Sequence, residues 1–314
     1  MNHLSEIRIK DAAPHIFRRP FLFVESGTQM LQIATFFAIG PQIYVDGIIV
    51  IDEVQKKPVG RINCKHIISS ILDSDYPDCL QKKASQIMDS SVIPLETDSP
   101  MKEALEVFER TRFAFIPILT KKGDRLDDLD DSFKVVTASL TIRDILPIIA
   151  KANLNISIRE LSSQLVSLHG NTSIRIALDY MLNNGIRNIG IRQEGSLEIA
   201  HDDVATENSR IKSILPGIIN DRKILEFLLS HNGRTVLRKN GIAGLGDLNI
   251  VNNLDIISPT TVKSNTTVSR AAELLMDIHN PCLILEDNKK GEHNYIITPW
   301  DIVMKTLLGG MSNN

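Results

Sequence analysis

The chain contains one short pattern twice, as Ser139-Leu140-Thr141-Ile142-Arg143-Asp144-Ile145 and as Ile297-Thr298-Pro299-Trp300-Asp301-Ile302. In each copy, β-prone residues run into Thr-x-x-Asp and then into an apolar pattern of helical period. A Thr at the helix N-cap accepts a hydrogen bond from a free backbone N–H group, and an acidic residue at the third helical position favours the positive end of the helix. Both copies therefore predict a strand that leads into a capped helix.

The Thr-x-x-Asp pattern has two interpretations. As capping boxes, both copies only stabilise the start of a helix, and this motif is common. As parts of a nucleotide site, the free amides of the helix N-terminus and the Thr hydroxyl bind phosphate, while the carboxylate of Asp144 or Asp301 accepts hydrogen bonds from the two hydroxyl groups of a ribose. The repeat that surrounds both copies favours the nucleotide site.

The composition is that of a soluble globular protein. The chain has 314 residues, enough for two domains of ordinary size, with 43% hydrophobic residues, 23% charged residues and a net charge of −3. This charge gives no electrostatic basis for binding nucleic acid or an anionic membrane. The apolar stretch 30–51 is interrupted by polar residues and Pro41, so no membrane span is expected. Three scattered cysteines and an N-terminus unlike a signal peptide predict a reducing, cytoplasmic location.

Four copies of one repeat follow each other along the chain. The repeat is strand, helix, strand, strand, helix: an amphipathic opening helix is followed by a β-prone run, a polar loop, a further strand and a closing helix. The fourth closing helix drifts by one position. The opening stripes are Leu31/Ala34/Thr35/Ala38, Met101/Ala104/Leu105/Phe108, Ile174/Ala177/Leu178/Met181 and Val268/Ala271/Ala272/Leu275. The pattern predicts an α/β (α+β) fold of four β-α-β-β-α repeats.

Three segments between these elements are expected to carry no chemistry. The acidic loop 121–131 lacks the ligand order of a calcium loop and is expected to be solvated. The insertion 193–217 contains His201-Asp202-Asp203 without a spacing that converges on a metal ion, so a mobile surface is expected. The stretch 240–247 follows a helix rather than a strand, and it is interpreted as a linker rather than a dinucleotide-binding loop.

The second repeat resembles the cystathionine-β-synthase (CBS) domain, from Ile87-Met88-Asp89-Ser90 through Ile116-Pro117-Ile118 to Thr141-x-x-Asp144. The fourth repeat resembles it nearly as well, from Asp255-Ile256-Ile257 to Thr298-x-x-Asp301. The resemblance implies that CBS repeats pair in tandem into two modules with pseudo-two-fold symmetry, and it leaves no separate catalytic domain. The expected repeats span residues 15–75, 84–152, 158–232 and 248–310.

The same resemblance implies ligand sites in clefts between paired repeats, which commonly bind adenine nucleotides or S-adenosylmethionine. Thr141 with Asp144, and Thr298 with Asp301, would hold phosphate and ribose. The other implied positions are Met88, Ser91, Ile93 and Phe113 around the base in the second repeat, Ser258 and Thr260 in the fourth, and Arg112 and His279 for polyphosphate. The apolar ones are also typical of a plain core, and the two basic ones of an exposed surface.

The first and third repeats depart from the pattern. They have Asn63-Cys64-Lys65-His66 and Asn220-Asp221-Arg222-Lys223 where Thr-x-x-Asp would fall, so neither keeps the carboxylate that would accept from ribose. His66 and Lys223 could still contact phosphate. We expect at most one good site in each module and two in total.

Three functions from different classes stay open at this stage. The first is a non-catalytic regulatory sensor that binds an adenine nucleotide (AMP, ADP or ATP), with or without Mg²⁺, and passes this state to an unidentified protein partner. The second is a structural scaffold with vestigial clefts, and an S-adenosylmethionine-binding CBS protein is a variant of the first. The third is an enzyme, against which the chain shows no phosphate loop and no nucleophile elbow. No cofactor is expected, no nucleic-acid or membrane partner is expected, and a homodimer is left open.

Overall fold

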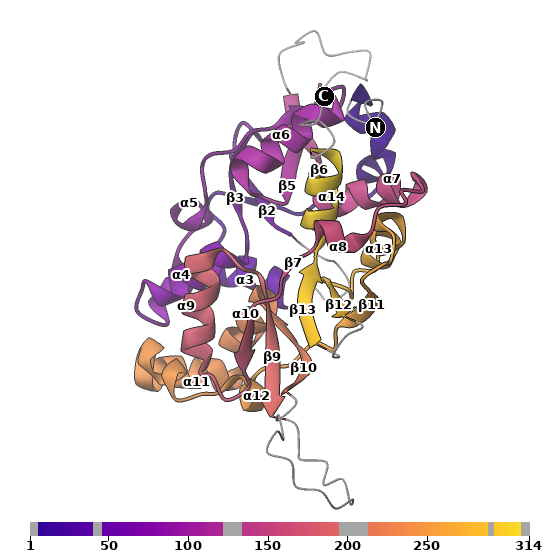
Figure 1. Ribbon diagram of the computed structural model, residues 1–314. Coiled ribbons are helices and arrows are strands. Elements are labelled where there is room, and N and C mark those ends of the chain that lie inside the picture. Colours follow the sequence, from indigo (N-terminus) through magenta and orange to yellow (C-terminus); the bar gives the residue numbers. More distant parts are fainter. Residues whose placement is uncertain (1–5, 40–45, 122–133, 195–212, 288–291, 309–314) are drawn as a thin grey trace, which may run out of the picture. The chain divides into compact units, whose positions relative to one another are not determined.

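The computed structural model describes residues 6–39, 46–121, 134–194, 213–287 and 292–308 (Figure 1). Within these ranges the chain forms four small sheets of three or four strands, each combined with helices. The chain divides into two compact units, one made of Met1–Gln164 with Thr260–Asn314 and the other of Leu165–Pro259. Residues 122–131 of the acidic loop and His201-Asp202-Asp203 of the insertion lie outside the described residues.

The first compact unit contains the first, second and fourth repeats. The first repeat consists of β1 (Phe23–Glu25), α3 (Met30–Ile39), β2 (Ile48–Ile51), β3 (Pro58–Ile62) and α4 (Cys64–Leu72). The second consists of β4 (Leu95–Glu96), α6 (Met101–Thr111), β5 (Phe115–Lys121), β6 (Lys134–Thr141), η3 (Ile142–Ile145) and α7 (Leu146–Lys151). The fourth consists of β11 (Thr260–Lys263), α13 (Val268–Leu275), β12 (Leu283–Asp287), β13 (Glu292–Ile297) and α14 (Pro299–Leu307).

The second compact unit contains the third repeat. This repeat consists of β8 (Ser167–His169), α9 (Ile174–Asn184), β9 (Asn188–Glu194), β10 (Ser213–Asn220) and α10 (Asp221–Leu229). Two further helices follow it, α11 (His231–Asn240) and the 3₁₀ helix η4 (Gly241–Gly246). The stretch 240–247, expected as a linker, is therefore mostly helical.

A short leading segment precedes the first strand of every repeat, at residues 6–22, 82–94, 156–164 and 248–259. These segments carry the remaining elements, α2 (Ile9–Ala12), η1 (Pro14–Phe17), α5 (Ala84–Ile87), α8 (Ile158–Leu161), β7 (Ser163–Gln164) and α12 (Ile250–Asn253). The 3₁₀ helix η2 (Asp78–Gln81) lies just before the second of them.

All four repeats share one strand order. In each, the first strand pairs in parallel with the second, and the second pairs antiparallel with the third. A parallel pair requires a crossover connection, which the opening helix supplies, whereas the antiparallel pair is joined directly. In the fourth repeat, β7 adds one more strand by pairing with β13. The predicted β-α-β-β-α repeat is thus confirmed in four copies.

Each leading segment binds the opening helix of another repeat. In all four cases the first amide of the helix donates to a carbonyl oxygen of the segment, over 2.7–2.8 Å. The four bonds are Met101 N to Ile7 O, Met30 N to Lys82 O, Val268 N to Ile156 O and Ile174 N to Leu248 O. The first and second repeats exchange their segments reciprocally, as expected of a pair related by pseudo-two-fold symmetry.

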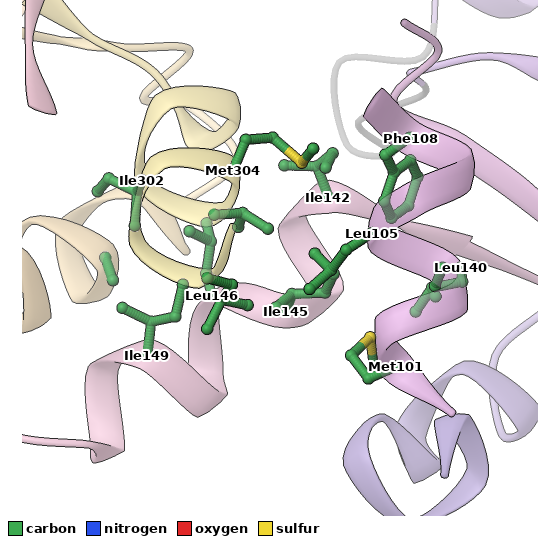
Figure 2. Packing of buried hydrophobic residues seen from close by; sticks show 14 of the residues in the cluster. Met101, Leu105, Phe108, Leu140, Ile142, Ile145, Leu146, Ile149, Ile302 and Met304 are labelled. Carbon is green, nitrogen blue, oxygen red and sulfur yellow. The ribbon is translucent and has the colours of Figure 1, made fainter. Parts of the chain in front are cut away.

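The second and fourth repeats share one hydrophobic core within the first compact unit. Figure 2 shows Ile142, Ile145 and Leu146 at the start of the second closing helix, with Met304 of α14 on one side and Phe108 of α6 on the other. Repeats from two different expected modules therefore associate within this one chain, which the sequence left open.

The predicted stripe of the first opening helix is wrong by one residue. Met30, Ile33, Ala34 and Phe37 are buried, whereas Leu31 is 38% exposed. Nearly every residue of α3 is apolar, so apolarity does not single out one face of the helix. The bond from Met30 N to Lys82 O fixes the register instead, because it matches the first bond of the other three opening helices.

The drift predicted in the fourth closing helix is also absent. Counted from the N-cap residue, Thr306 occupies the position of Ile71, Ile149 and Leu228, and it is equally buried (4% exposed). The backbone register is therefore kept, and a polar residue replaces an apolar one.

Candidate functional site

Asp144 lies at the start of the second closing helix and is almost fully buried (3% exposed). Its Oδ2 accepts hydrogen bonds from the backbone N and from Oγ1 of Thr141, at 2.7 and 2.8 Å. Two basic residues of the first leading segment complete its surroundings. Arg19 Nη2 donates to Oδ2 at 2.7 Å, and His15 Nε2 lies 3.0 Å from Oδ1. The expected capping box is present, and the carboxylate also has two basic partners from far away in the sequence.

The surroundings of Asp144 stabilise its charged form. Burial acts to raise the pKa of Asp144, but the hydrogen bond from His15, the charge of Arg19 and the bonds from Thr141 outweigh it and hold this pKa below its ordinary value of 3.8. The side chains of His15 and Arg19 are 46% and 44% exposed. The site therefore presents two basic groups to solvent beside a buried anion.

Asp301 in the fourth repeat is held in a similar way. Its Oδ2 accepts from the backbone N and from Oγ1 of Thr298, at 3.0 and 2.6 Å. Its Oδ1 accepts from Ser163 Oγ at 3.0 Å and pairs with Lys305 Nζ at 2.8 Å. Lys305 Nζ also donates to Leu161 O at 2.7 Å and to Ser163 Oγ at 3.0 Å. At both carboxylates Oδ2 caps the helix and a leading segment contacts Oδ1, and at Asp144 the leading segment also contacts Oδ2 through Arg19.

The first repeat has a histidine at the corresponding position. His66 replaces the acid, and its Nδ1 accepts a hydrogen bond from Asn63 N at 3.1 Å. The imidazole stacks on Phe113 with 5.6 Å between ring centroids, and the guanidinium carbon of Arg61 lies 3.6 Å from the centroid of the same ring. Arg61 in turn pairs with Asp89 at 3.1 Å. Burial lowers the pKa of His66, although the charge of Asp89 opposes this shift, so the imidazole is neutral at pH 7.

The third repeat has a related arrangement. Asn220 Oδ1 accepts from Lys223 N at 2.9 Å, and Lys223 Nζ lies 2.7 Å from Glu226 Oε2 and 3.6 Å from Asp255 Oδ2. Asp255 follows α12 at the same place where Asp89 follows α5. In the first and third repeats a basic residue therefore stands at the third helical position, and its acidic partner comes from the leading segment of the second or fourth repeat. The second repeat has the opposite polarity.

Two of the residues expected around the base lie against the first repeat. A Cβ added at Gly60 would be only 2.2 Å from Met88 Sδ, so Met88 packs directly on β3. Phe113 packs with Phe115 and strand β2 in a small separate cluster. Ile93 packs instead against the core that the second and fourth repeats share. The described polar contacts of Asp144 involve none of these three residues.

The expected polar residues of the second repeat are exposed. Ser91 donates its backbone N–H to Asp89 Oδ1 at 2.7 Å. Arg112 ends α6 in the left-handed conformation, with φ of 57°. Neither side chain has a described hydrogen bond to Asp144.

In the fourth repeat, Thr260 Oγ1 donates to Asn280 Oδ1 at 2.6 Å. Arg143, which lies between Thr141 and Asp144 in the sequence, donates to Asn280 O at 2.9 Å and to Leu275 O, and so it binds the end of α13. His279 is exposed beside this junction, and Ser258 is an exposed residue of the second compact unit. Thr260 therefore lies next to a contact between the second and fourth repeats.

Several residues at the two carboxylates were not predicted. His15, Arg19 and Ser163 lie 125 to 138 residues from the carboxylates they contact, and no local pattern connects them. Lys305 was detectable, because it follows Asp301 by four residues on a helix and such pairs face each other.

Other kinds of site find little support in the described part of the chain. No group of three or more His, Cys, Asp or Glu side chains there is arranged to hold a metal ion. None of its helices combines the length and the apolarity that crossing a membrane requires. An open hollow of about 650 Å³ lies between β1 and α3, and none of the predicted site residues lines it.

The four repeats and their capped closing helices define the class of protein. Residues 84–150 match the family model of the CBS domain, and this range coincides with the second repeat and its leading segment. Residues 84–150 of the chain are therefore a CBS domain.

Two solved structures show the same fold over most of the chain. Protein MJ1225 from Methanocaldococcus jannaschii, described as a candidate archaeal homologue of γ-AMPK, is 15% identical, with 96% of this chain and 100% of that chain covered and a TM-score of 0.73. An uncharacterized conserved protein from Pyrococcus horikoshii is 15% identical, with 84% and 92% covered and a TM-score of 0.50. A search of curated proteins gave no match.

Proposed function

We propose that this protein is a non-catalytic regulatory sensor that binds adenine nucleotides beside Asp144 and Asp301. The observation that carries the proposal is the shared geometry of the two carboxylates. In each, Oδ2 is fixed by the backbone N–H and hydroxyl of a Thr, so the carboxylate is oriented before a ligand arrives. A preoriented carboxylate at a helix N-terminus suits the two hydroxyl groups of a ribose.

The regulatory part of the proposal rests on how the repeats are connected. Both carboxylates contact a leading segment that belongs to another repeat, through Arg19 in one case and Ser163 in the other. A ligand that replaces these contacts changes the energy of the junction between repeats. Such a ligand shifts the protein between two arrangements only by its difference in affinity for them. A protein partner, or a second copy of the chain, would respond to that shift.

One observation favours a second candidate, a structural scaffold. The third helical position of every closing helix already has partners within the chain, including Asp89 near His66 and Asp255 near Lys223. A scaffold requires nothing more than this internal satisfaction. An S-adenosylmethionine-binding protein is the variant of the sensor in which the adenosyl group carries no phosphate.

Isothermal titration of nucleotide-free protein with AMP, ADP, ATP and S-adenosylmethionine, with and without Mg²⁺, tests the proposal. We expect binding of at least one ligand. Asp144→Asn and Asp301→Asn each remove the charge with little change in volume, and each is expected to weaken or abolish one site. Asp98→Asn is the matched control, because Asp98 is an exposed aspartate that also pairs with basic residues of the first leading segment. Absence of heat with all four ligands would contradict the sensor and leave the scaffold.

A further inference from the structure

The two carboxylates differ in the cations beside them. At Asp301, the cation is Lys305 from the same helix, and at Asp144, the basic groups are His15 and Arg19 from the first leading segment. If both sites bind a ribose, this difference determines whether each site also binds a phosphate attached to that ribose.

Lys305 has no donor left for a ligand. A lysine ammonium group carries three N–H donors, and the contacts of Lys305 Nζ with Leu161 O, Ser163 Oγ and Asp301 Oδ1 use three. Lys305 therefore joins the third leading segment to Asp301.

Arg19 keeps most of its donors. A guanidinium group has five N–H donors in a fixed fork. Within the part of the chain that the structure describes, the polar contacts of Arg19 are both made by Nη2, with Asp144 Oδ2 at 2.7 Å and Ser139 O at 3.3 Å. The side chain is also 44% exposed, so its other N–H groups are accessible to an anion.

The backbone that carries Arg19 and His15 is fixed. Ile9, Ala13 and Ile16 of the same segment are completely buried in the core that the second and fourth repeats share. Ile9 N also donates to Ser99 O at 2.9 Å. The two basic side chains therefore stay beside Asp144 when a ligand enters, and only their rotamers need to change.

We infer that Arg19, assisted by His15, makes the Asp144 site selective for ligands that carry a phosphate on the ribose, a selectivity that the Asp301 site lacks. This inference rests on the proposed function. A phosphate beside the buried carboxylate alone would be repelled, whereas the guanidinium group of Arg19 adds a positive charge beside both anions and donates charge-assisted hydrogen bonds to the phosphate from Nε and Nη1, which Asp144 and Ser139 leave free.

The test compares AMP with adenosine by isothermal titration in protein carrying Asp301→Asn, which weakens or abolishes the Asp301 site so that the Asp144 site dominates the measured binding. We expect AMP to bind more tightly than adenosine. Arg19→Gln should weaken AMP about tenfold or more, the usual effect of losing a charge-assisted bond, and should leave adenosine nearly unchanged. Arg19→Lys should fall between the two for AMP, because it keeps the charge but has three N–H donors instead of five. Arg18→Ala removes the same charge one residue away, on an exposed side chain, and should leave both affinities unchanged.

The outcomes separate this inference from the proposed function. Tighter binding of both ligands by Arg19→Gln would show that Arg19 only competes for Asp144, and the inference would be wrong. Equal weakening of both ligands, or no effect on either, would also overturn it while nucleotide binding stands. If protein that carries both wild-type sites binds neither ligand, nor any of the nucleotides above, the proposed function itself fails. Circular dichroism of each variant shows whether it is folded.

Discussion

Replacement of Asp144 by Ala is expected to destabilise the first compact unit by more than the loss of an exposed ion pair would. The change deletes the carboxylate of the capping box, and the loss of its hydrogen bonds with Thr141 costs about 1 kcal/mol. It also deletes the pair with Arg19 and the contact with His15. A fully buried pair costs about 3–5 kcal/mol when broken, and an exposed pair about 0.2–1 kcal/mol. The side chain of Asp144 is 4% exposed but that of Arg19 is 44% exposed, so this pair should cost about 1–2 kcal/mol and the whole substitution about 2–3 kcal/mol.

A double-mutant cycle separates the pair from the cap. Arg19→Ala leaves Asp144 its bonds from Thr141 and its contact with His15, so it should cost about 1–2 kcal/mol. In the double variant, the loss should be smaller than the sum of the two single losses by about 1–2 kcal/mol, because each single variant already removes the pair. Urea unfolding followed by circular dichroism at pH 7 measures these values as shifts of the midpoint at unchanged slope.

The matched control is Asp98→Ala, which breaks two ion pairs with Arg8 and Lys10 of the same leading segment. Because Asp98 is exposed, its midpoint should stay close to that of the unmodified protein. The reasoning would be refuted if Asp144→Ala shifted the midpoint no more than Asp98→Ala, or if the losses of Asp144→Ala and Arg19→Ala were simply additive.

Two further measurements test the buried groups. Burial lowers the pKa of His66 below its ordinary value of 6.5. As the pH falls, His66 is therefore protonated at a higher pH in the unfolded chain than in the folded one. The stabilisation is therefore complete above about pH 6.5 and is lost as the pH falls towards the lower folded value; His66→Gln should flatten the loss of stability between pH 7 and 5.5, and an unchanged profile would contradict this. Burial raises the pKa of Cys282 to about 12, and Cys64 and Cys79 are buried as well. Iodoacetamide at pH 8 should therefore label all three cysteines only after denaturation, which mass spectrometry measures; rapid labelling of the native protein at Cys282 would refute it.

The repeat was predictable because its signals are local. The apolar stripe of α6 and the capping residue Thr141 depend on residues only a few positions apart, and the structure confirms the two helices that they predicted. The register of α3 was missed for the same reason. Its apolar residues surround the helix, and the bond from Met30 to Lys82 that sets the register joins distant parts of the chain.

The capping role of Asp144 and Asp301 was also predictable, since Thr-x-x-Asp defines it by spacing alone. Their other partners were not. His15 and Arg19 belong to no recognisable sequence motif. They lie beside Asp144 because Ile16, between them, is buried in a core formed by the second and fourth repeats. The nucleotide assignment itself stays a prediction.

The amino-acid sequence by itself determined four β-α-β-β-α repeats and two acid-capped closing helices, because helix period, strand composition and capping act over a few residues. Only the tertiary structure decided which side chains face those acids. Leading segments cross from one repeat to another and place Arg19 beside Asp144 and Ser163 beside Asp301. Such contacts depend on how whole repeats pack against each other, and a local sequence pattern does not predict that packing.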